Sequence, residues 1–404
     1  MSHRSRELLK SELIMVVVTF LLLFPDFHGM FAGMEGFAFD LYMKMMPESR
    51  AAADSPVVID VDDQSYRDCF GSASPLKPEK VMDLVNLALK NEAKVVAVDL
   101  VTDSEGYRFL HTDAAEGQSV IWSATASVVS REVSFLQWLV GCDAQFMKPG
   151  VALGQMVTPN PGFLWAVPAY ARDDDLRIRR LPRSYPLENS KELIPALSRK
   201  TAMRFRELPS DANAPELMIT HKGEKLDRIP ATKLLGCTPN GKLEPTVFPD
   251  SFKEPALSQQ GIKDRIVLVG GTFRQSNDFH ESSHGMLPGV VINANAIQAE
   301  LNGHYVANPK KVWLFLLDVI IGTVFTVLVW RFPPANDWRL ILVTIIAVVL
   351  LYVIAGRFLL AANILWVSWT GALIGAVSGF IVERGFEKPK PSTSQETVPP
   401  VSRV

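Results

Sequence analysis

Charge of either sign is scarce in this sequence. Charged residues make up 21% of its 404 residues, and 41 Lys+Arg against 43 Asp+Glu leave a formal net charge of −2. Without a basic excess the chain is not a general nucleic-acid binder, and without an acidic excess it is not an acidic disordered chain. The composition therefore leaves folded soluble domains and membrane proteins as the classes to distinguish.

Cysteine is scarcer still. The three cysteines, Cys69, Cys142 and Cys237, lie far apart at irregular spacing. This spacing fits neither a metal-binding pattern nor a disulfide framework. In an oxidising compartment two of them could pair and leave one over, and three buried free thiols are an equal alternative.

Apolar residues, by contrast, make up 48% of the chain and are concentrated near its two ends. The first run, LIMVVVTFLLLF, follows three basic residues and fits the h-region of a signal peptide as well as a membrane anchor. Because no A-x-A cleavage site follows it, we favour an uncleaved anchor. We expect four transmembrane helices, at residues 13–39, 312–330, 340–356 and 364–382.

Basic residues in the short connecting segments set the expected orientation, because such residues are enriched in cytoplasmic loops. They lie before the first span, between the second and third spans, and after the fourth, which all fall on one side of the membrane. We therefore expect the tails 1–12 and 383–404 in the cytoplasm and a domain of residues 40–311 outside it. The second tail is rich in Pro, Ser and Thr and is predicted to be disordered.

Within residues 40–311, apolar runs alternate with helical patterns. PVVIDV (56–61) and KVVAVDLV (94–101) are typical of buried strands, and residues 78–91 carry apolar side chains at helical spacing. Strand, helix and strand in this order predict a parallel βαβ unit. The domain is therefore predicted to be α/β, with a mixed, largely parallel sheet and helices on both faces, beside an all-α membrane region. Further strands are expected at 119–125, 151–157 and 265–270, helices at 191–205 and 290–301, and a hairpin or edge strand within 170–185.

Three blocks of the domain, taken in order, resemble one known family. PVVIDVDDQSY, a helix and AKVVAVDL are similar to the opening of a CHASE2 domain, and DDDLRIRRLP is similar to its Asp-rich turn and Arg pair. KDRIVLVGGT and MLPGVVINANAIQAELNG resemble its closing block. The layout, with one span before the domain and three after it, is also similar, and the resemblance covers residues 13–382.

The resemblance implies an extracytoplasmic sensory domain in a bacterial inner membrane. Because 22 residues follow position 382, we expect a separate protein to supply the output. We expect a non-enzymatic sensory subunit without a cofactor, which binds a ligand or a partner membrane or envelope protein and relays the event through its spans. A structural scaffold subunit of an envelope-spanning complex is the main alternative. A homo-oligomer and an unknown small ligand remain open, and no nucleic-acid partner is expected.

The segment HESSH supplies a third alternative, an extracytoplasmic zinc metallohydrolase. On a helix, His280 and His284 would share a face and bind zinc, with Glu281 activating water. The local sequence does not favour a helix, because two serines fill the motif and GMLPG follows it. The resemblance also places the segment in the loop between the closing strand and helix. We interpret the motif as coincidence, with a weak two-His metal site or a pH-sensitive loop as the remaining readings.

Acidic residues that follow the predicted strands are the candidate ligand-binding residues. Asp60, Asp62 and Asp63 lie at the carboxyl end of the first strand, Asp99 lies near the end of the next, and Asp278 follows the strand at 265–270. Ligands of open α/β sheets bind beyond the carboxyl ends of the strands, where these acids converge if the strands are adjacent. They could hold a cation or a polar ligand there, or they could cap helices and turns.

Four residues of the predicted spans are assigned to the membrane or to packing. Asp318 lies inside the second span, where a carboxylate is costly unless it faces neighbouring helices or the interface. Gly371, Gly375 and Gly379 recur every four residues and give a small-residue face for close helix packing. That face would serve a dimer or contacts within one chain equally.

Overall fold

The computed structural model describes the domain and a few single positions outside it. The chain divides into two compact units, and the larger one comprises Gly29–Val312 and Tyr352–Val367. The described positions of the other unit are helical. The described residues are 13, 17, 39–40, 43–44, 54–130, 151–157, 163–168, 170, 176–188, 192–207, 217–218, 226–237, 261–303, 316, 319–320 and 323.

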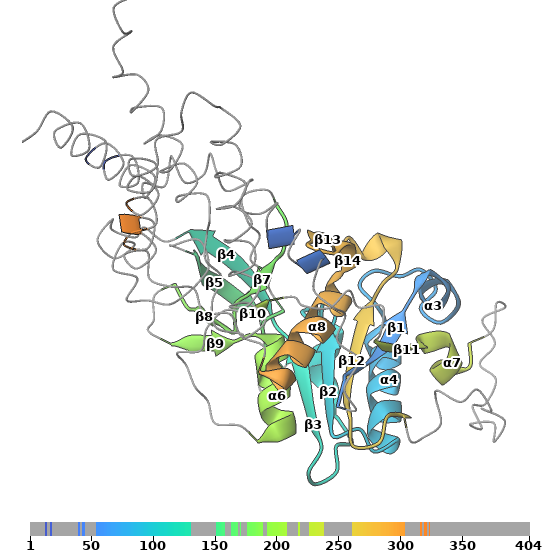
Figure 1. The fold of residues 1–404 in the computed structure, drawn as a ribbon. Coiled ribbons are helices and arrows are strands. Elements are labelled where there is room, and N and C mark those ends of the chain that lie inside the picture. The colour runs from blue at the N-terminus through green and yellow to red at the C-terminus, as the bar shows by residue number, and fades with distance from the viewer. Residues whose placement is uncertain are drawn as a thin grey trace, which may run out of the picture. The chain divides into compact units, whose positions relative to one another are not determined.

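A six-stranded sheet forms the centre of the larger unit (Figure 1). Its strands are β1 (Val57–Val61), β2 (Val95–Asp99), β3 (Ser119–Ser123), β6 (Leu164–Ala166), β11 (Asp227–Pro230) and β12 (Ile266–Gly271). The order across the sheet is β11-β1-β12-β2-β3-β6, and every neighbouring pair is parallel. The late strand β12 thus lies between β1 and β2, which follow one another in the chain.

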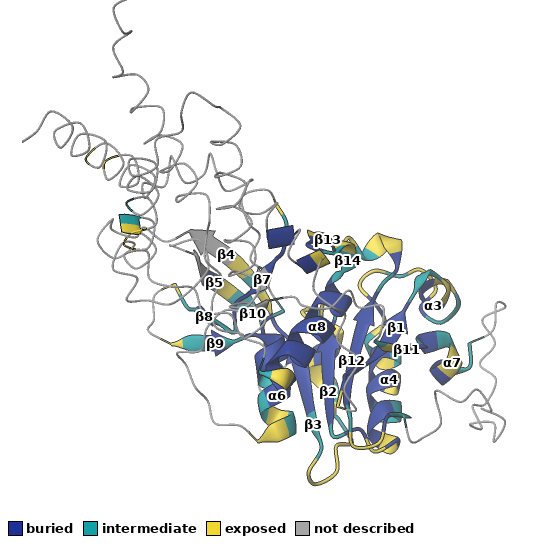
Figure 2. Cartoon of the chain, in the orientation of Figure 1, coloured by how far each residue is buried: buried dark blue, intermediate teal, exposed yellow. Residues whose placement is uncertain are grey.

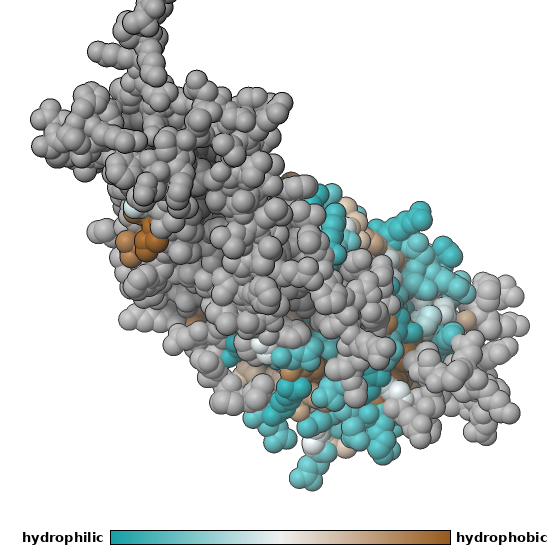
Figure 3. Space-filling view, viewed as in Figure 1, coloured by the Kyte–Doolittle hydropathy of each residue, from teal (hydrophilic) through white to brown (hydrophobic). Residues whose placement is uncertain are grey.

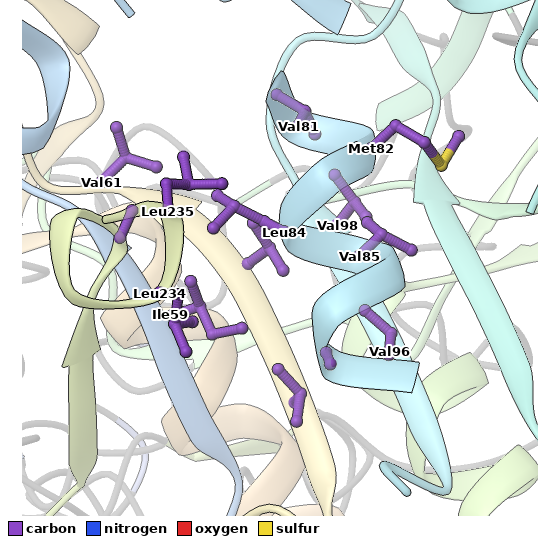
Figure 4. Packing of buried hydrophobic residues seen from close by; sticks show 14 of the residues in the cluster. Ile59, Val61, Val81, Met82, Leu84, Val85, Val96, Val98, Leu234 and Leu235 are labelled. Carbon is purple, nitrogen blue, oxygen red and sulfur yellow. The ribbon is translucent and has the colours of Figure 1, made fainter. Parts of the chain in front are cut away.

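Helices cover both faces of this sheet. The described helices are α3 (Asp63–Asp68), α4 (Pro78–Lys90), α6 (Leu197–Arg206), α7 (Ala231–Leu235) and α8 (Gly289–Asn302), with the short 3-10 helices η1 (Glu105–Phe109) and η3 (Arg274–Ser276). Side chains of α4 and α7 pack on one face, among them Leu84, Val85 and Leu234 against Ile59 and Val98 (Figure 4). Each such side chain, fully buried, stabilises the fold by about 1.5–3 kcal/mol. Residues of α6 and α8 pack on the opposite face.

Helix α8 is buried along nearly its whole length. All residues from Gly289 to Leu301 are buried, because α8 packs on the sheet with one side and on Ile178 and Leu181 with another. The outer sides of α4 and α6 are exposed instead (Figure 2). The described surface on the face seen in Figure 3 is mainly hydrophilic, as expected of a domain in water. Because α8 is buried, its polar residues need hydrogen-bond partners inside the protein.

Four antiparallel pairs of strands complete the described structure. They are β4 (Thr125–Ser130) with β5 (Val151–Val157), β7 (Arg180–Leu181) with β10 (Leu217–Met218), β8 (Ser184–Pro186) with β9 (Leu193–Pro195), and β13 (Phe279–Ser282) with β14 (Gly285–Pro288). Together with the parallel sheet they confirm the predicted α/β class with a largely parallel sheet and helices on both faces.

Two predicted elements differ from the structure. The helix expected at 191–205 begins only at Leu197, because Leu193–Pro195 forms β9. Pro195 disfavours helical geometry at the preceding residue, so the helix cannot extend back through Ile194. The strand expected at 151–157 is present, but it pairs with β4 outside the six-stranded sheet.

The four predicted membrane spans lie outside the described residues, apart from single positions. Within the part of the chain that the structure describes, no helix has the length and hydrophobicity needed to cross a bilayer. The spans therefore stay a prediction.

Cys69 and Cys237 form a disulfide, which decides between the two alternatives left by the sequence. Their Cα atoms are 5.4 Å apart and 168 positions separate them in the chain. The bond joins the end of α3 to the end of α7. Cys142 lies outside the described residues.

Loss of this disulfide is expected to lower the free energy of unfolding by about 2–4 kcal/mol, because the bond closes a long loop and restricts the unfolded chain. Cys69→Ser with Cys237→Ser should unfold at correspondingly lower urea concentration in pulse proteolysis of the full-length protein in detergent. A reductant should destabilise the wild type but not this variant. Equal stability of variant and wild type would contradict the prediction, and Cys142→Ser serves as the control that keeps the bond.

Candidate functional site

Two of the predicted acids share the carboxyl edge of the sheet. Asp60 of β1 and Asp99 of β2 both pair in register with Gly270 of β12, the strand between them. All three lie on the face covered by α8, since the residues two positions earlier on each strand belong to the core beneath that helix. With parallel strands about 4.8 Å apart, the two aspartate Cα atoms are about 10 Å apart.

A hydrogen-bonded arrangement fixes Asp99. Asn293 of α8 donates from Nδ2 to Asp99 Oδ2 at 2.9 Å and to the hydroxyl oxygen of Tyr170 at 2.8 Å. Asp99 is 8% exposed and Asn293 is 3% exposed. Because buried polar groups cost free energy unless they are paired, these bonds orient the carboxyl group and hold it against the start of α8.

Asp278 and His280 complete the group. Asp278 follows η3, and its Oδ1 lies 2.8 Å from His280 Nε2. The ring of His280 packs against that of Tyr170 with centroids 4.7 Å apart. The carbonyl of Asp278 accepts the backbone N–H of Gly289, the first residue of α8, at 2.8 Å. We call Asp99, Tyr170, Asp278, His280 and Asn293 the polar cluster.

The polar cluster disfavours the charged form of one of its carboxyl groups, that of Asp99. Burial and, to a smaller extent, the charge of Asp278 raise the pKa of Asp99 to about 8, although the hydrogen bond from Asn293 opposes them. Burial, followed by the charges of Asp99 and Asp278, also raises the pKa of Tyr170 well above its ordinary value. A second negative charge is therefore unfavourable beside Asp278.

Two glycines permit the close packing at this edge. A Cβ atom on Gly270 would overlap the side chain of Val290 in α8, and a Cβ atom on Gly289 would overlap the carboxylate of Asp278. A larger residue at either position would push α8 away from β12 or displace Asp278. The two positions thus set the distance between the sheet, the helix and the cluster.

The other three predicted acids make capping and turn contacts. Asp60 accepts a hydrogen bond from Thr272 Oγ1 at 2.5 Å, and burial raises its pKa. Asp62 caps α3 by accepting the backbone N–H of Ser65 at 2.7 Å. Asp63 accepts the N–H of Arg274 at 2.8 Å. The structure therefore brings Asp99 and Asp278 together and engages Asp60, Asp62 and Asp63 elsewhere along the edge.

The HESSH segment forms a β-hairpin, which confirms the expectation that it is not a helix. His280 and Glu281 lie in β13, and His284 lies in the turn before β14. Because alternate residues of a strand face opposite sides, His280 is 9% exposed and the side chain of Glu281 is 53% exposed. Among the described residues, no group of three or more His, Cys, Asp or Glu side chains is placed to hold a metal ion.

The membrane candidates cannot be placed against this geometry. Asp318, Gly371, Gly375 and Gly379 lie outside the described residues. Their assignment to the membrane or to helix packing stays a prediction.

Sequence reasoning missed Asn293 and Tyr170. A signal for Asn293 was present, because VVINANAIQ places an amide inside an otherwise apolar helix, where it requires a buried partner. Tyr170 carried no such signal, since it reaches the cluster only through the folding of a distant segment.

The fold and the polar cluster define an open parallel α/β domain with polar groups at its carboxyl edge. A protein-family model described as the CHASE2 domain matches residues 13–331. The match covers most of the 404 residues, and the chain belongs to the CHASE2 domain family. This match confirms the resemblance indicated by the sequence. CHASE2 domains are extracellular sensor domains. No curated protein and no solved structure gives a significant match.

Proposed function

We propose that this protein is a sensory subunit of a bacterial inner membrane, whose extracytoplasmic CHASE2 domain binds a small polar ligand at the polar cluster. Binding is relayed through the spans to a partner protein that carries the output. The observation behind this proposal is the buried polar cluster at the carboxyl ends of β2 and β12, the edge at which open α/β sheets bind ligands. A carboxyl group with a strongly raised pKa at such an edge supports a functional site.

The chemistry of the cluster favours a cation or a hydrogen-bond donor as the ligand. The side chain of Asp278 is 36% exposed, so the cluster reaches solvent through a carboxylate. A donor or a positive charge beside Asp278 would also relieve its unfavourable interaction with Asp99. Amines, hydroxyl-rich molecules and divalent cations are the matching classes.

Two further observations support the location. The Cys69–Cys237 disulfide is the kind of bond that persists in an oxidising compartment such as the periplasm. The family match extends over both flanking segments that are predicted to cross the membrane, 13–39 and 312–330. Nine residues, 303–311, separate the end of helix α8, which carries Asn293, from the start of the second of these segments.

Ligand binding can be tested on the full-length protein in detergent micelles. Calcium ions, spermidine and sorbitol represent the three ligand classes, and each is titrated while the melting temperature is followed. We expect at least one of them to raise the melting temperature by mass action, and Asp278→Asn to abolish the rise.

The matched control for this experiment is Asp63→Asn, because Asp63 is an acid of the same sheet edge that makes a turn contact. It should retain the rise seen in the wild type. If none of the three probes raises the melting temperature, or if the rise persists in Asp278→Asn, ligand binding at the cluster is disproved.

The scaffold alternative predicts a different outcome of the same preparation. A scaffold subunit would co-purify in a large stable complex and show no response to any probe, whereas a sensor responds to a probe with or without its partner. Co-purification alone therefore does not distinguish the two, and the probe response does.

We also propose that the protein is not a hydrolase. The support is that His280 and Glu281 lie on opposite faces of β13, with Glu281 paired to Arg177 at 3.3 Å. We expect metal analysis of the purified protein to find no stoichiometric zinc. Stoichiometric zinc together with hydrolysis that Glu281→Ala abolishes would overturn this proposal.

A further inference from the structure

The β13–β14 hairpin contacts two different parts of the domain. On its buried face, His280 belongs to the polar cluster. From Glu281 onward, the hairpin contacts the segment Arg177–Arg179: the N–H of Ile178 donates to the carbonyl of Glu281 at 2.7 Å, and Ile178 also forms a parallel bridge with Ser282. One short hairpin thus joins the cluster to this arginine segment.

The arginine segment in turn holds residues that directly follow the first predicted span. Arg179 binds Asp40 with two parallel hydrogen bonds, Nε to Oδ1 at 2.8 Å and Nη2 to Oδ2 at 2.9 Å. Arg177 adds a bond from Nη1 to Asp40 Oδ2 at 2.6 Å and reaches back to Glu281. The side chains of Arg179 and Asp40 are 3% and 5% exposed, so this pair is buried.

The residues around Asp40 are anchored in the domain as well. Phe39 and Met43, four positions apart in helical backbone, are 4% and 2% exposed. Burial by itself would raise the pKa of Asp40, but hydrogen bonds from Arg179, Arg177 and Ser283 of the hairpin outweigh it and lower that pKa. Asp40 is therefore ionised at neutral pH. We call the described residues Phe39, Asp40, Met43 and Lys44 the juxtamembrane segment, since the first predicted span ends at residue 39.

We propose that the β13–β14 hairpin transmits a change at the polar cluster to the juxtamembrane segment, and that the Asp40–Arg179 pair is the point of attachment. This inference rests on the proposed function, because it takes the cluster as the place where the signal is received.

The physical reason lies in the geometry of the buried pair. A bidentate arginine–carboxylate pair fixes both planar groups, and a buried carboxylate left without its partner is strongly unfavourable. A shift of β13 that moves Ile178 and Ser283 must therefore carry Asp40 along or break the pair. In either case the residues at the end of the first span change their position or their order.

Hydrogen exchange on the full-length protein in detergent micelles tests this coupling without a ligand. His280→Gln perturbs the cluster from the hairpin itself. We expect it to accelerate amide exchange of the hairpin, and also of the juxtamembrane segment by about tenfold. In an Arg179→Gln background, where the attachment is already broken, His280→Gln should no longer change exchange of the juxtamembrane segment.

Arg183→Gln is the matched background for comparison. Arg183 binds Glu300 of α8 with the same two-bond geometry, at 2.6 and 2.7 Å, and both side chains are mostly buried. There the effect of His280→Gln on the juxtamembrane segment should persist. If Arg179→Gln misfolds, Asp40→Glu provides a second test, because it retains the charge. In this variant part of the coupling should remain.

The outcomes separate this inference from the proposed function. If His280→Gln accelerates exchange of the hairpin but leaves the juxtamembrane segment unchanged, or if its effect survives in Arg179→Gln, the coupling is disproved while ligand binding stands. If the melting temperature responds to none of the three probes although the coupling is observed, the proposed ligand site fails and the mechanical connection stands.

Discussion

Replacing Arg179 with glutamine is expected to lower the free energy of unfolding by about 3–5 kcal/mol, because it leaves the buried carboxylate of Asp40 without its main partner. Arg177 remains bonded to Asp40, but its side chain is 40% exposed and it supplies one bond in place of two. The loss is measured by pulse proteolysis in urea on the full-length protein in detergent micelles.

Two further variants test whether this loss of stability comes from the unpaired buried charge. Arg179→Met combined with Asp40→Leu removes both charges and should recover most of the stability, because an apolar pair of similar volume needs no compensation. Arg206→Gln removes the exposed pair of Arg206 with Asp54, and should change the free energy of unfolding by less than about 1 kcal/mol. A similar loss for Arg179→Gln and Arg206→Gln would show that the Asp40 pair is not buried in the folded protein.

Asp99→Asn is expected to stabilise the protein increasingly as the pH rises from 5 to 8, and so to weaken the dependence of stability on pH. In the folded protein burial raises the pKa of Asp99 from its ordinary 3.8 to about 8. Between these two values the unfolded chain has released the proton while the folded chain retains it. The unfolded state therefore binds fewer protons, and stability falls as the pH rises through this window.

The asparagine variant lacks this titration and keeps an oxygen that can accept the bond from Asn293. Relative to wild type, its stability should rise by up to about 1.4 kcal/mol for each pH unit within the window. Some pH dependence should remain, because burial also raises the pKa of Asp60.

Urea denaturation midpoints between pH 5 and pH 8 measure the effect of Asp99→Asn. The control is Asp83→Asn at an exposed position of α4, whose side chain is 51% exposed. That variant should follow the wild type at every pH. Parallel curves for Asp99→Asn and wild type would contradict a protonated Asp99 at neutral pH.

Local sequence patterns predicted the parallel core because those patterns report burial directly. PVVIDV and KVVAVDLV are nearly continuous apolar runs, a pattern typical of a strand that helices cover on both faces. They form β1 and β2. The helical spacing of Val81, Leu84 and Val85 likewise predicted α4. The same patterns could not show that β12 lies between β1 and β2, because periodicity within a strand carries no information about its neighbour.

The sequence also predicted only part of the candidate site. The sequence placed Asp99 near the end of its strand and Asp278 after its strand, and general rules for α/β sheets directed attention to that edge. The pairing of Asp99 with Asn293, the packing of His280 on Tyr170 and the burial of the Asp40–Arg179 pair all join residues more than a hundred positions apart. No local pattern specifies such contacts.

By itself, the amino-acid sequence determined the α/β class, the CHASE2 family and the acids at the carboxyl edge, since each of these depends on residue type, periodicity or order along the chain. Only the tertiary structure decided that Cys69 pairs with Cys237, that HESSH is a hairpin and that burial raises the pKa of Asp99. These three depend on which distant groups the fold brings within a few ångströms of each other. That proximity sets the geometry available to the thiols and the desolvation of the carboxyl group.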